Sequence, residues 1–254
     1  MGTTVFERLP TSPARIAHSL EKTRRSVFWL DGLAAPQHPE LRGAHSADLV
    51  VVGGGYTGLW TALRAKERGP HRRVVVREAR TIGWAASGRN GGFCEASITH
   101  GHENGLSRWP DEIDQLERLG RENLDGIQET IARYNMDAEF ERTGTLSVVV
   151  EPHQAEWLNG ASEYLDAAAT RALVNSPTYL GGYWEQGDTA LVHPAKLAIE
   201  LARVAVELGV EIFEHSRVTG IDDGTVVRTT GGSVAAQQVA LGTNVFPSLL
   251  KRNK

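Results

Sequence analysis

A short apolar run followed at once by a glycine-rich turn and a helix constrains this sequence more than any other feature. Residues Leu49–Val52 form a continuous, mostly β-branched run, as a strand buried on both faces of a parallel sheet requires. The run ends at a turn with the spacing GxGxxG, from Gly53 to Gly58, which leads into a predicted helix over Tyr56–Arg68. A second valine run, Val74–Val76, predicts another buried strand. Strand, turn, helix and strand in this order predict a βαβ unit.

The spacing of the glycines in this turn has a physical reason. Gly53 permits a tight turn directly after the strand, and Gly55 lets backbone amides approach a pyrophosphate with no Cβ in the way. Gly58 lets the helix lie close to the strand. The helix begins with Tyr56 and Thr57, and its N-terminus presents free N–H groups and the positive end of its dipole to the phosphates. We interpret the turn as a dinucleotide site, and a purely structural glycine turn is the alternative.

An acidic residue stands where the sugar of a dinucleotide is held. Glu78 ends the second predicted strand, about 20 residues after the glycine turn, the place of the acid that binds a ribose 2′-hydroxyl. Its neighbour Arg77 is a charge where the strand should be apolar, and it either points out of the sheet or pairs with Glu78. The turn and the acid alone do not distinguish NAD from FAD.

Two further segments favour FAD over NAD. The glycine-rich loop Ile82–Phe93 follows the acid closely, and its amides can lie along the rest of an extended cofactor. Within it, Arg89, Asn90 and Gly91 are the candidate contacts, through their backbone more than their side chains, and a turn braced by Arg89 is the structural alternative. Far downstream, the predicted strand Val239–Leu241 runs into Gly242, Thr243 and Asn244. A turn of small residues after a buried strand can approach the cofactor again.

The segment Asp48–Trp60, the loop Ser87–Phe93 and the turn Gly242–Asn244 together resemble the FAD-dependent D-amino-acid-oxidase-type oxidoreductases. Within them, the gamma-glutamylputrescine-oxidase-like amine oxidoreductases are the most similar branch. The resemblance runs from about Ser26 to the end, and Ser87–Phe93 is its most specific part. Family members usually have Leu at the position of Arg77, and they continue well beyond the last turn. The chain is therefore expected to be the N-terminal part of such a protein.

This resemblance implies a non-covalent FAD and a set of contacts to it. It implies Glu78 on the adenosine ribose, Ser87–Gly92 near the flavin, Val218 near the adenine through its backbone, and Gly242–Asn244 close to the pyrophosphate. It also implies oxidation of a primary or secondary amine, an amino acid or polyamine derivative, by hydride transfer to flavin N5. The sequence identifies no catalytic residue. Two alternatives stay open: a non-catalytic truncated fragment that binds only the ADP part of FAD, and an NAD-dependent dehydrogenase.

The predicted fold class is α/β, a Rossmann-like FAD-binding domain interrupted by an incomplete α+β substrate domain. The expected division is an N-terminal arm at 1–46, the FAD-binding domain in two parts at 47–105 and 190–245, a partial substrate domain at 106–189 and a truncated tail at 246–254. Residues 81–105 are expected to be largely loop. Helices are predicted over Pro110–Tyr134, Pro152–Ala172 and Ala195–Leu208, and a strand over Phe140–Val150.

Composition limits the partners. With 27 Lys and Arg against 31 Asp and Glu, the chain gives no electrostatic reason to expect nucleic acid. The single cysteine, Cys94, excludes a disulfide framework and a thiolate cluster, and His100 and His102 lack a metal-binding motif, so no metal is expected. No apolar run approaches the roughly 20 residues that span a bilayer, so we expect no membrane contact and a cytoplasmic location. Trp60 and Trp84 are expected to be packing residues, and the oligomeric state stays open.

Overall fold

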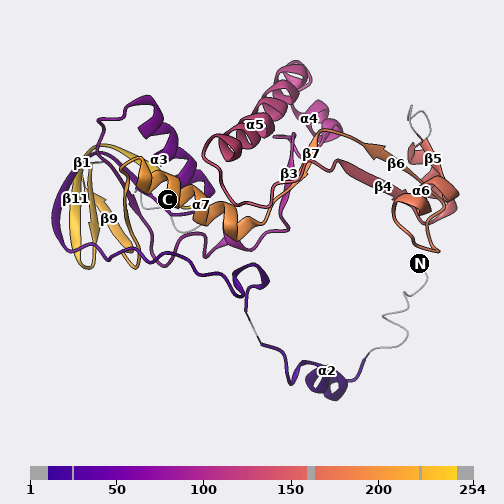
Figure 1. Cartoon of the computed structure of the whole chain (residues 1–254), viewed down its shortest axis with the longest axis horizontal. Helices are drawn as coiled ribbons and strands as arrows, with labels where there is room; N and C mark the ends of the chain where they lie inside the picture. The colour runs from indigo at the N-terminus through magenta and orange to yellow at the C-terminus, as the bar shows by residue number, and fades with distance from the viewer. Residues whose placement is uncertain (1–10, 25, 159–163, 223–224, 245–254) are drawn as a thin grey trace.

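The core of the chain is a six-stranded sheet with the strand order β8-β2-β1-β11-β10-β9 (Figure 1). The computed structural model describes residues 11–24, 26–158, 164–222 and 225–244. The strands are β1 (Gly43–Val52), β2 (Val74–Arg77), β8 (Glu211–Phe213), β9 (Val218–Asp222), β10 (Val226–Thr229) and β11 (Gly232–Leu241). Strands β8, β2, β1 and β11 run parallel, and β10 and β9 continue the sheet antiparallel. The predicted α/β class with a parallel sheet is confirmed.

Strand β1 lies in the middle of the parallel part, between β2 and β11. This position explains the continuous apolar run at its end, because both faces of Val50 and Val51 are covered and neither side chain is exposed. The strand begins at Gly43, earlier than the predicted Leu49, and its first residues pair with Gly232–Ala236 of β11. The predicted end of the arm, after residue 46, therefore falls inside β1. The first half of the strand has no continuous apolar pattern, so the sequence did not predict it as a strand.

Two helices cover one face of the sheet, α3 (Tyr56–Arg68) and α7 (Pro194–Glu207). Leu59 and Leu63 of α3 and Leu201 of α7 are completely buried against Val51 and Val76. The opposite face of the sheet carries a second, smaller apolar cluster. Its buried members are Leu41, Ala47, Val50, Val52, Val75, Val218, Val227 and Val234. The βαβ unit and the helix predicted over Ala195–Leu208 are thus present at nearly the predicted bounds.

Ten further elements lie between β2 and α7 in the described part of the chain. They are η2 (Ala86–Gly88), β3 (Phe93–Glu95), α4 (His102–Arg108), α5 (Ile113–Arg133), β4 (Thr145–Val149), η3 (Pro152–Leu158), β5 (Tyr164–Asp166), α6 (Ala167–Leu173), β6 (Gly181–Glu185) and β7 (Thr189–Leu191). Strands β3 and β7 form an antiparallel ribbon, and β4, β6 and β5 form a separate sheet in that order. In Figure 1 the ribbon connects the region of α7 to this smaller sheet.

Several predicted elements in this part were wrong. The helix expected over Pro152–Ala172 is replaced by η3, β5 and α6, and residues 159–163 lie outside the described ones. Asp166 ends β5 and caps α6, since its carboxylate accepts the Ala169 N–H at 2.8 Å. Residues 81–105 are largely loop as expected, apart from η2, β3 and the start of α4, whereas the strand expected over Phe140–Val150 is confined to β4. The boundaries expected at 105/106 and 189/190 fall inside α4 and β7.

The N-terminal segment approaches the core only in its second half. Helix α2 (Pro13–Leu20) has no buried residue, whereas η1 (Phe28–Leu30) reaches α7, where the ring of Trp29 packs edge-on against His193 at 5.0 Å. Leu41 is almost completely buried in the smaller cluster. Among the helices that the structure describes, none combines the length and apolar character needed to cross a membrane.

Candidate functional site

The glycine turn after β1 is closed so tightly that two of its positions admit only glycine. Gly53 has a φ of +115°, and a Cβ there would lie 2.5 Å from the carbonyl oxygen of Gly242. A Cβ on Gly58 would lie 1.9 Å from the carbonyl oxygen of Gly53. The Gly53 N–H donates to the Arg77 carbonyl at 2.7 Å, which ties the turn to the end of β2. These contacts give Gly53 and Gly58 the roles predicted for them, a tight turn and close packing of helix on strand.

The N-terminus of α3 opens beside the glycine-rich loop. Its N-cap is Gly55, which has no side chain to accept a hydrogen bond from the first turn. The hydroxyl of Ser87 takes that place, because its Oγ accepts the Tyr56 N–H at 2.9 Å. Thr57 follows on the exposed side of the first turn. A Cβ on Gly55 would lie 2.9 Å from this Oγ, so Ser87 packs directly against the positive end of the α3 dipole.

Glu78 lies just below the glycine turn, with only 6% of its surface exposed. Its Oε2 accepts the Gly54 N–H at 2.7 Å, and its Oε1 accepts the Arg80 N–H at 2.8 Å and the Trp84 indole N–H at 2.7 Å. The sequence left open whether Arg77 pairs with Glu78, and it does not. The Arg77 guanidinium lies 4.6 Å from the centre of the Phe213 ring.

The loop Ile82–Phe93 is held by its own side chains. Arg89 donates from Nε to the Ala85 carbonyl at 3.2 Å and from its Nη2 to the Trp84 carbonyl. Asn90 donates to the carbonyls of Ala86 and Ser87 at 3.1 and 3.0 Å, and its Oδ1 accepts the Gly92 N–H at 2.9 Å. Both side chains are thus used within the loop. The prediction that Arg89 and Asn90 contact a ligand through their backbone stays a prediction.

Two glycines of this loop, one in its middle and one near its end, determine its path. A Cβ on Gly88 would lie 2.2 Å from the Gly83 carbonyl oxygen, so the loop closes on itself there. Gly92 has a φ of +80°, and its carbonyl accepts the Val192 N–H at 2.9 Å just before α7. Gly91, which precedes Gly92, is exposed, as is the nearby Phe93. The loop therefore runs from Glu78 to the start of α7 with a defined shape.

Tyr56 connects the first turns of the two helices. Its hydroxyl donates to the Pro194 carbonyl at 2.8 Å, and burial raises the pKa of Tyr56 to about 12. The half-buried thiol of Cys94 lies close enough to raise that pKa further, and burial raises the pKa of Cys94 itself. At neutral pH both groups are therefore protonated, and Tyr56 acts as a hydrogen-bond donor.

The late turn returns to the same place. The Gly242 N–H donates to the Val52 carbonyl at 2.8 Å, so β11 ends against the glycine turn. Thr243 and Asn244 follow, and Asn244 has a left-handed φ of +53°. Val218 is buried at the start of β9, two residues after Ser216, whose N–H donates to the Glu78 carbonyl at 2.8 Å. All the predicted segments therefore meet at the carboxyl ends of β1, β2 and β11, where ligands bind in parallel α/β sheets.

The contact between Trp84 and Glu78 was not predicted from the sequence. It was expected to be a packing residue, but its indole N–H donates to Glu78. Its position inside the glycine-rich loop was the only signal available, and the contact depends on how that loop folds back to the acid.

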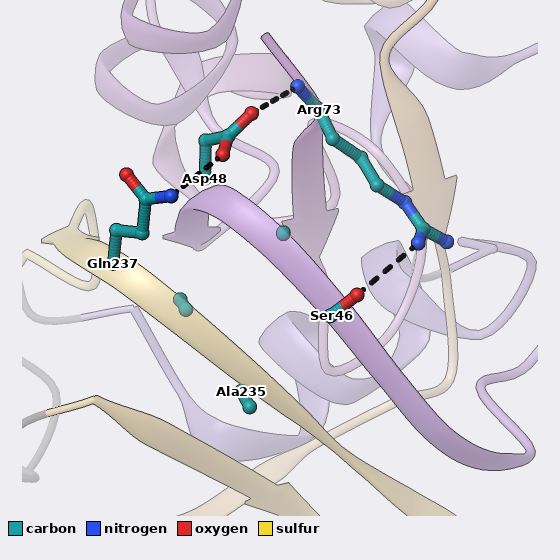
Figure 2. A pocket seen from close by; sticks show the side chains of 7 residues that line it. Ser46, Asp48, Arg73, Ala235 and Gln237 are labelled. Carbon is teal, nitrogen blue, oxygen red and sulfur yellow. Dashed lines mark hydrogen bonds between the residues drawn. The ribbon is translucent and has the colours of Figure 1, made fainter.

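A cavity of about 340 Å³ lies elsewhere, beside the first half of β1 (Figure 2). Asp48 accepts the Arg73 N–H at 2.8 Å and the Gln237 side-chain amide at 3.0 Å across it. Arg73 also pairs with Glu211 at 2.7 Å. These polar groups satisfy one another, and the cavity is far along β1 from the glycine turn. We therefore assign the candidate site to the convergence at the strand ends.

Comparison with known proteins places this geometry in a family. The family described as DAO, FAD dependent oxidoreductase, matches residues 48–253, which is most of the chain. The chain belongs to this family. The family resemblance predicted from the sequence is thus confirmed, and the NAD-linked alternative loses its support.

Among curated relatives, this member of the DAO family is 36% identical over 230 residues to the gamma-glutamylputrescine oxidoreductase of Escherichia coli K12, covering 82% of this chain and 53% of the relative. It is 29% identical over 236 residues to the probable oxidoreductase OrdL of Haemophilus influenzae, covering 85% of this chain and 53% of the relative. The chain thus spans about half the length of the curated relatives it matches. A glycine oxidase from Geobacillus kaustophilus shares the fold, with a TM-score of 0.63, 22% identity and coverage of 78% of this chain and 55% of the other.

Proposed function

We propose that the chain binds FAD non-covalently at the convergence described above. The proposed contacts are those expected from the sequence: the glycine turn Gly53–Gly58 and the start of α3 for the pyrophosphate, Glu78 for the adenosine ribose, Val218 for the adenine, Ser87–Gly92 for the flavin and Gly242–Asn244 for the pyrophosphate from the other side. The observation that carries the proposal is that the glycine turn contacts Glu78, the loop from Gly83 and the late turn at Gly242, although Gly53 and Gly242 are 189 residues apart in the sequence. Membership of an FAD-dependent family supports it.

The residues present fit the ADP part of such a cofactor. The N-cap Gly55 brings no side chain to the positive end of α3, where Ser87 Oγ takes the Tyr56 N–H, and a helix N-terminus is where a pyrophosphate is stabilised. Glu78 is a buried acceptor directly beneath that turn, suited to sugar hydroxyls. Among the described residues, Glu78 takes its hydrogen bonds from N–H groups and no arginine or lysine side chain pairs with it. A carboxylate at this position accepts from ribose hydroxyls and disfavours a 2′-phosphate.

We propose further that the protein oxidises a primary or secondary amine, an amino acid or a polyamine derivative. When bound, FAD supplies at its N5 atom the acceptor for a hydride from the carbon next to the amine nitrogen. The chain's own residues shape the site: Arg89 and Asn90 fix the loop, and Tyr56 fixes that loop's neighbour α7. The name of the E. coli relative, gamma-glutamylputrescine oxidoreductase, supports a polyamine derivative as the substrate.

The division of the chain stays a proposal as well. We propose that the six-stranded sheet with α3 and α7 forms the FAD-binding unit, and that the sheet β4-β6-β5 with its helices belongs to a substrate unit. The ribbon β3–β7 would be the double crossing between them. The predicted divisions near residues 46, 105 and 189 therefore move to the ends of the elements that they cut.

The reaction is tested by adding amines to the FAD-loaded chain without oxygen and recording the visible flavin absorbance. Gamma-glutamylputrescine is expected to bleach it, and the same molecule with its free amine acetylated is the matched control. Persistence of the flavin bands with every primary and secondary amine tested, on a chain that holds FAD, would overturn the amine proposal.

A further inference from the structure

The carboxylate of Glu78 is nearly saturated with hydrogen bonds from the protein itself. A carboxylate has about four lone-pair positions, two on each oxygen. The Arg80 N–H and the Trp84 indole N–H occupy both positions on Oε1, and the Gly54 N–H occupies one on Oε2. Only one position, on Oε2, remains for a further donor. Burial of Glu78 makes these bonds important, because a buried charge is costly unless it is hydrogen-bonded.

A ribose brings two neighbouring hydroxyls, and a carboxylate that accepts from both needs two open positions, whereas Glu78 has one. Oε1 offers none while its two present donors stay. The Arg80 N–H is fixed, because the Arg80 carbonyl on the same residue accepts the His215 N–H at 2.9 Å. The Gly54 N–H is fixed in the glycine turn, whose Gly54 carbonyl accepts the Gly83 N–H at 3.0 Å. The indole is a side chain that rotates about its own bonds.

We propose that Trp84 is a displaceable donor that satisfies Glu78 in the empty site and that the cofactor ribose must replace. This proposal rests on the proposed FAD binding and deepens it by naming the residue that tunes affinity for the adenosine half. Trp84 stabilises the protein before binding and opposes binding to the same extent. It is a positioning residue for Glu78.

The surroundings of Trp84 tie this exchange to the flavin-facing loop. The Arg80 guanidinium lies 4.5 Å from the centre of the indole ring, and that of Arg89 lies 5.9 Å from it. Arg89 also donates to the Trp84 carbonyl. Movement of the indole off Glu78 therefore disturbs contacts of Arg89, which holds Ser87–Gly92 in place. Occupation of the ribose site is thereby communicated to the part of the loop proposed to face the flavin.

The test is a binding titration of ADP to the full chain and to Trp84→Phe, which keeps an aromatic ring and removes the N–H. We expect the melting temperature of ligand-free W84F to fall and its affinity for ADP to rise about tenfold, since a hydrogen bond to a charged group no longer has to be broken. If Trp84 had only a structural role, W84F would lower both the melting temperature and the affinity for ADP. The gain should vanish with 2′,3′-dideoxy-ADP, which has no ribose hydroxyls to compete.

Trp60→Phe is the matched control, because Trp60 also packs under an arginine, Arg64 at 5.1 Å, but makes no contact with Glu78. Its affinity for ADP should equal that of the wild type. Equal or weaker ADP binding by W84F, or the same gain with the dideoxy compound, overturns the proposal while leaving FAD binding intact. If neither wild type nor W84F binds ADP or FAD, the proposed function fails and this inference fails with it.

Should W84F not fold, indole N–H spectra of the ¹⁵N-tryptophan-labelled wild type decide the question. The indole proton of Trp84 is hydrogen-bonded to a buried carboxylate and is expected to resonate downfield. ADP is expected to move that resonance to the position of a free indole. Binding of ADP with this resonance unmoved overturns the proposal.

Discussion

The guanidinium of Arg77 lies inside the smaller apolar cluster, over the ring of Phe213, with 1% of the residue exposed. None of its three nitrogens has a hydrogen-bond partner among the described residues. Burial lowers the pKa of Arg77 to about 10, so the side chain is still charged at neutral pH. A buried charge without a hydrogen-bonded partner is destabilising. Family resemblance gives Leu at this position, which fits the apolar surroundings.

Arg77→Leu is therefore expected to stabilise the chain, raising the free energy of unfolding in urea by about 1–3 kcal/mol. Arg73→Leu is the matched control, because Arg73 lies on the neighbouring turn, is exposed and pairs with Glu211 at 2.7 Å. Loss of that exposed pair should change stability by less than about 1 kcal/mol. A clear loss of stability in Arg77→Leu would show that the guanidinium has a stabilising partner.

Gly58 is the position of the turn where added volume is least tolerable. Gly58→Ala places a Cβ 1.9 Å from the Gly53 carbonyl oxygen, and it should cost about 1–3 kcal/mol of stability and weaken FAD binding. Gly126, in helix α5, has nothing within 4 Å of its Cβ position. Gly126→Ala should thus stabilise the chain by about 0.5–1 kcal/mol. Thermal melts of the two variants should move in opposite directions, and a neutral Gly58→Ala would contradict the tight turn.

At the scale of elements, helices α4 and α5 are connected by an exposed pair, His102 Nδ1 and Glu117 Oε1 at 2.5 Å. The hydrogen bond to Glu117 raises the pKa of His102, and the same bond lowers the pKa of Glu117. A raised histidine pKa gives stability that is present below the unfolded value and is lost as pH rises through the folded value. A lowered glutamate pKa gives stability that is lost as pH falls through its folded value.

His102→Ala should therefore lower the melting temperature most between these two titrations, by at most about 2 °C, and should have no effect above the folded pKa of His102. Melts of wild type and variant across pH 4 to 9 measure this window. Glu117→Gln should produce the same loss over this range, and a smaller loss at alkaline pH because Glu117 also pairs with Arg121 at 3.6 Å. A penalty in His102→Ala that persists at alkaline pH would mean that the residue stabilises the helices without its charge.

How far the elements could be predicted depended on whether a local pattern dictated them. The βαβ unit was found because a buried strand must be continuously apolar and its turn must be glycine, as at Val50, Val51 and Gly53. Helix α5 was found from its amphipathic period. The first half of β1 was missed because residues such as His45 and Ser46 carry no apolar pattern. The region of η3, β5 and α6 was predicted as one helix because its break is set by pairing of β5 with β6.

The candidate site shows the same limit. Its segments could be named from glycine spacing and one acid, because these residues make the turn on their own. The contacts between these segments could not be predicted, because Ser87 reaches Tyr56, and Trp84 reaches Glu78, only when the loop folds back. Pairings between distant segments such as Gly242 and Val52 depend on the topology of the whole sheet. Sequence therefore identified the parts of the site, and the fold determined how they meet.

For the molecule as a whole, the central proposal is that segments near both ends of this chain are sufficient to bind FAD. The chain spans about half the length of the curated relatives it matches, so its own capacity to bind the cofactor is the decisive point. Within the described residues, the turn at Gly53, the loop from Gly83 to Gly92 and the turn at Gly242 are already in contact.

The most direct measurement is the absorption spectrum of the purified 254-residue chain after incubation with FAD and desalting. We expect the visible flavin bands to stay with the protein, at one FAD per chain, and FMN, which lacks the AMP part, to be washed away. A colourless eluate from protein whose circular dichroism shows a folded α/β chain would contradict this expectation.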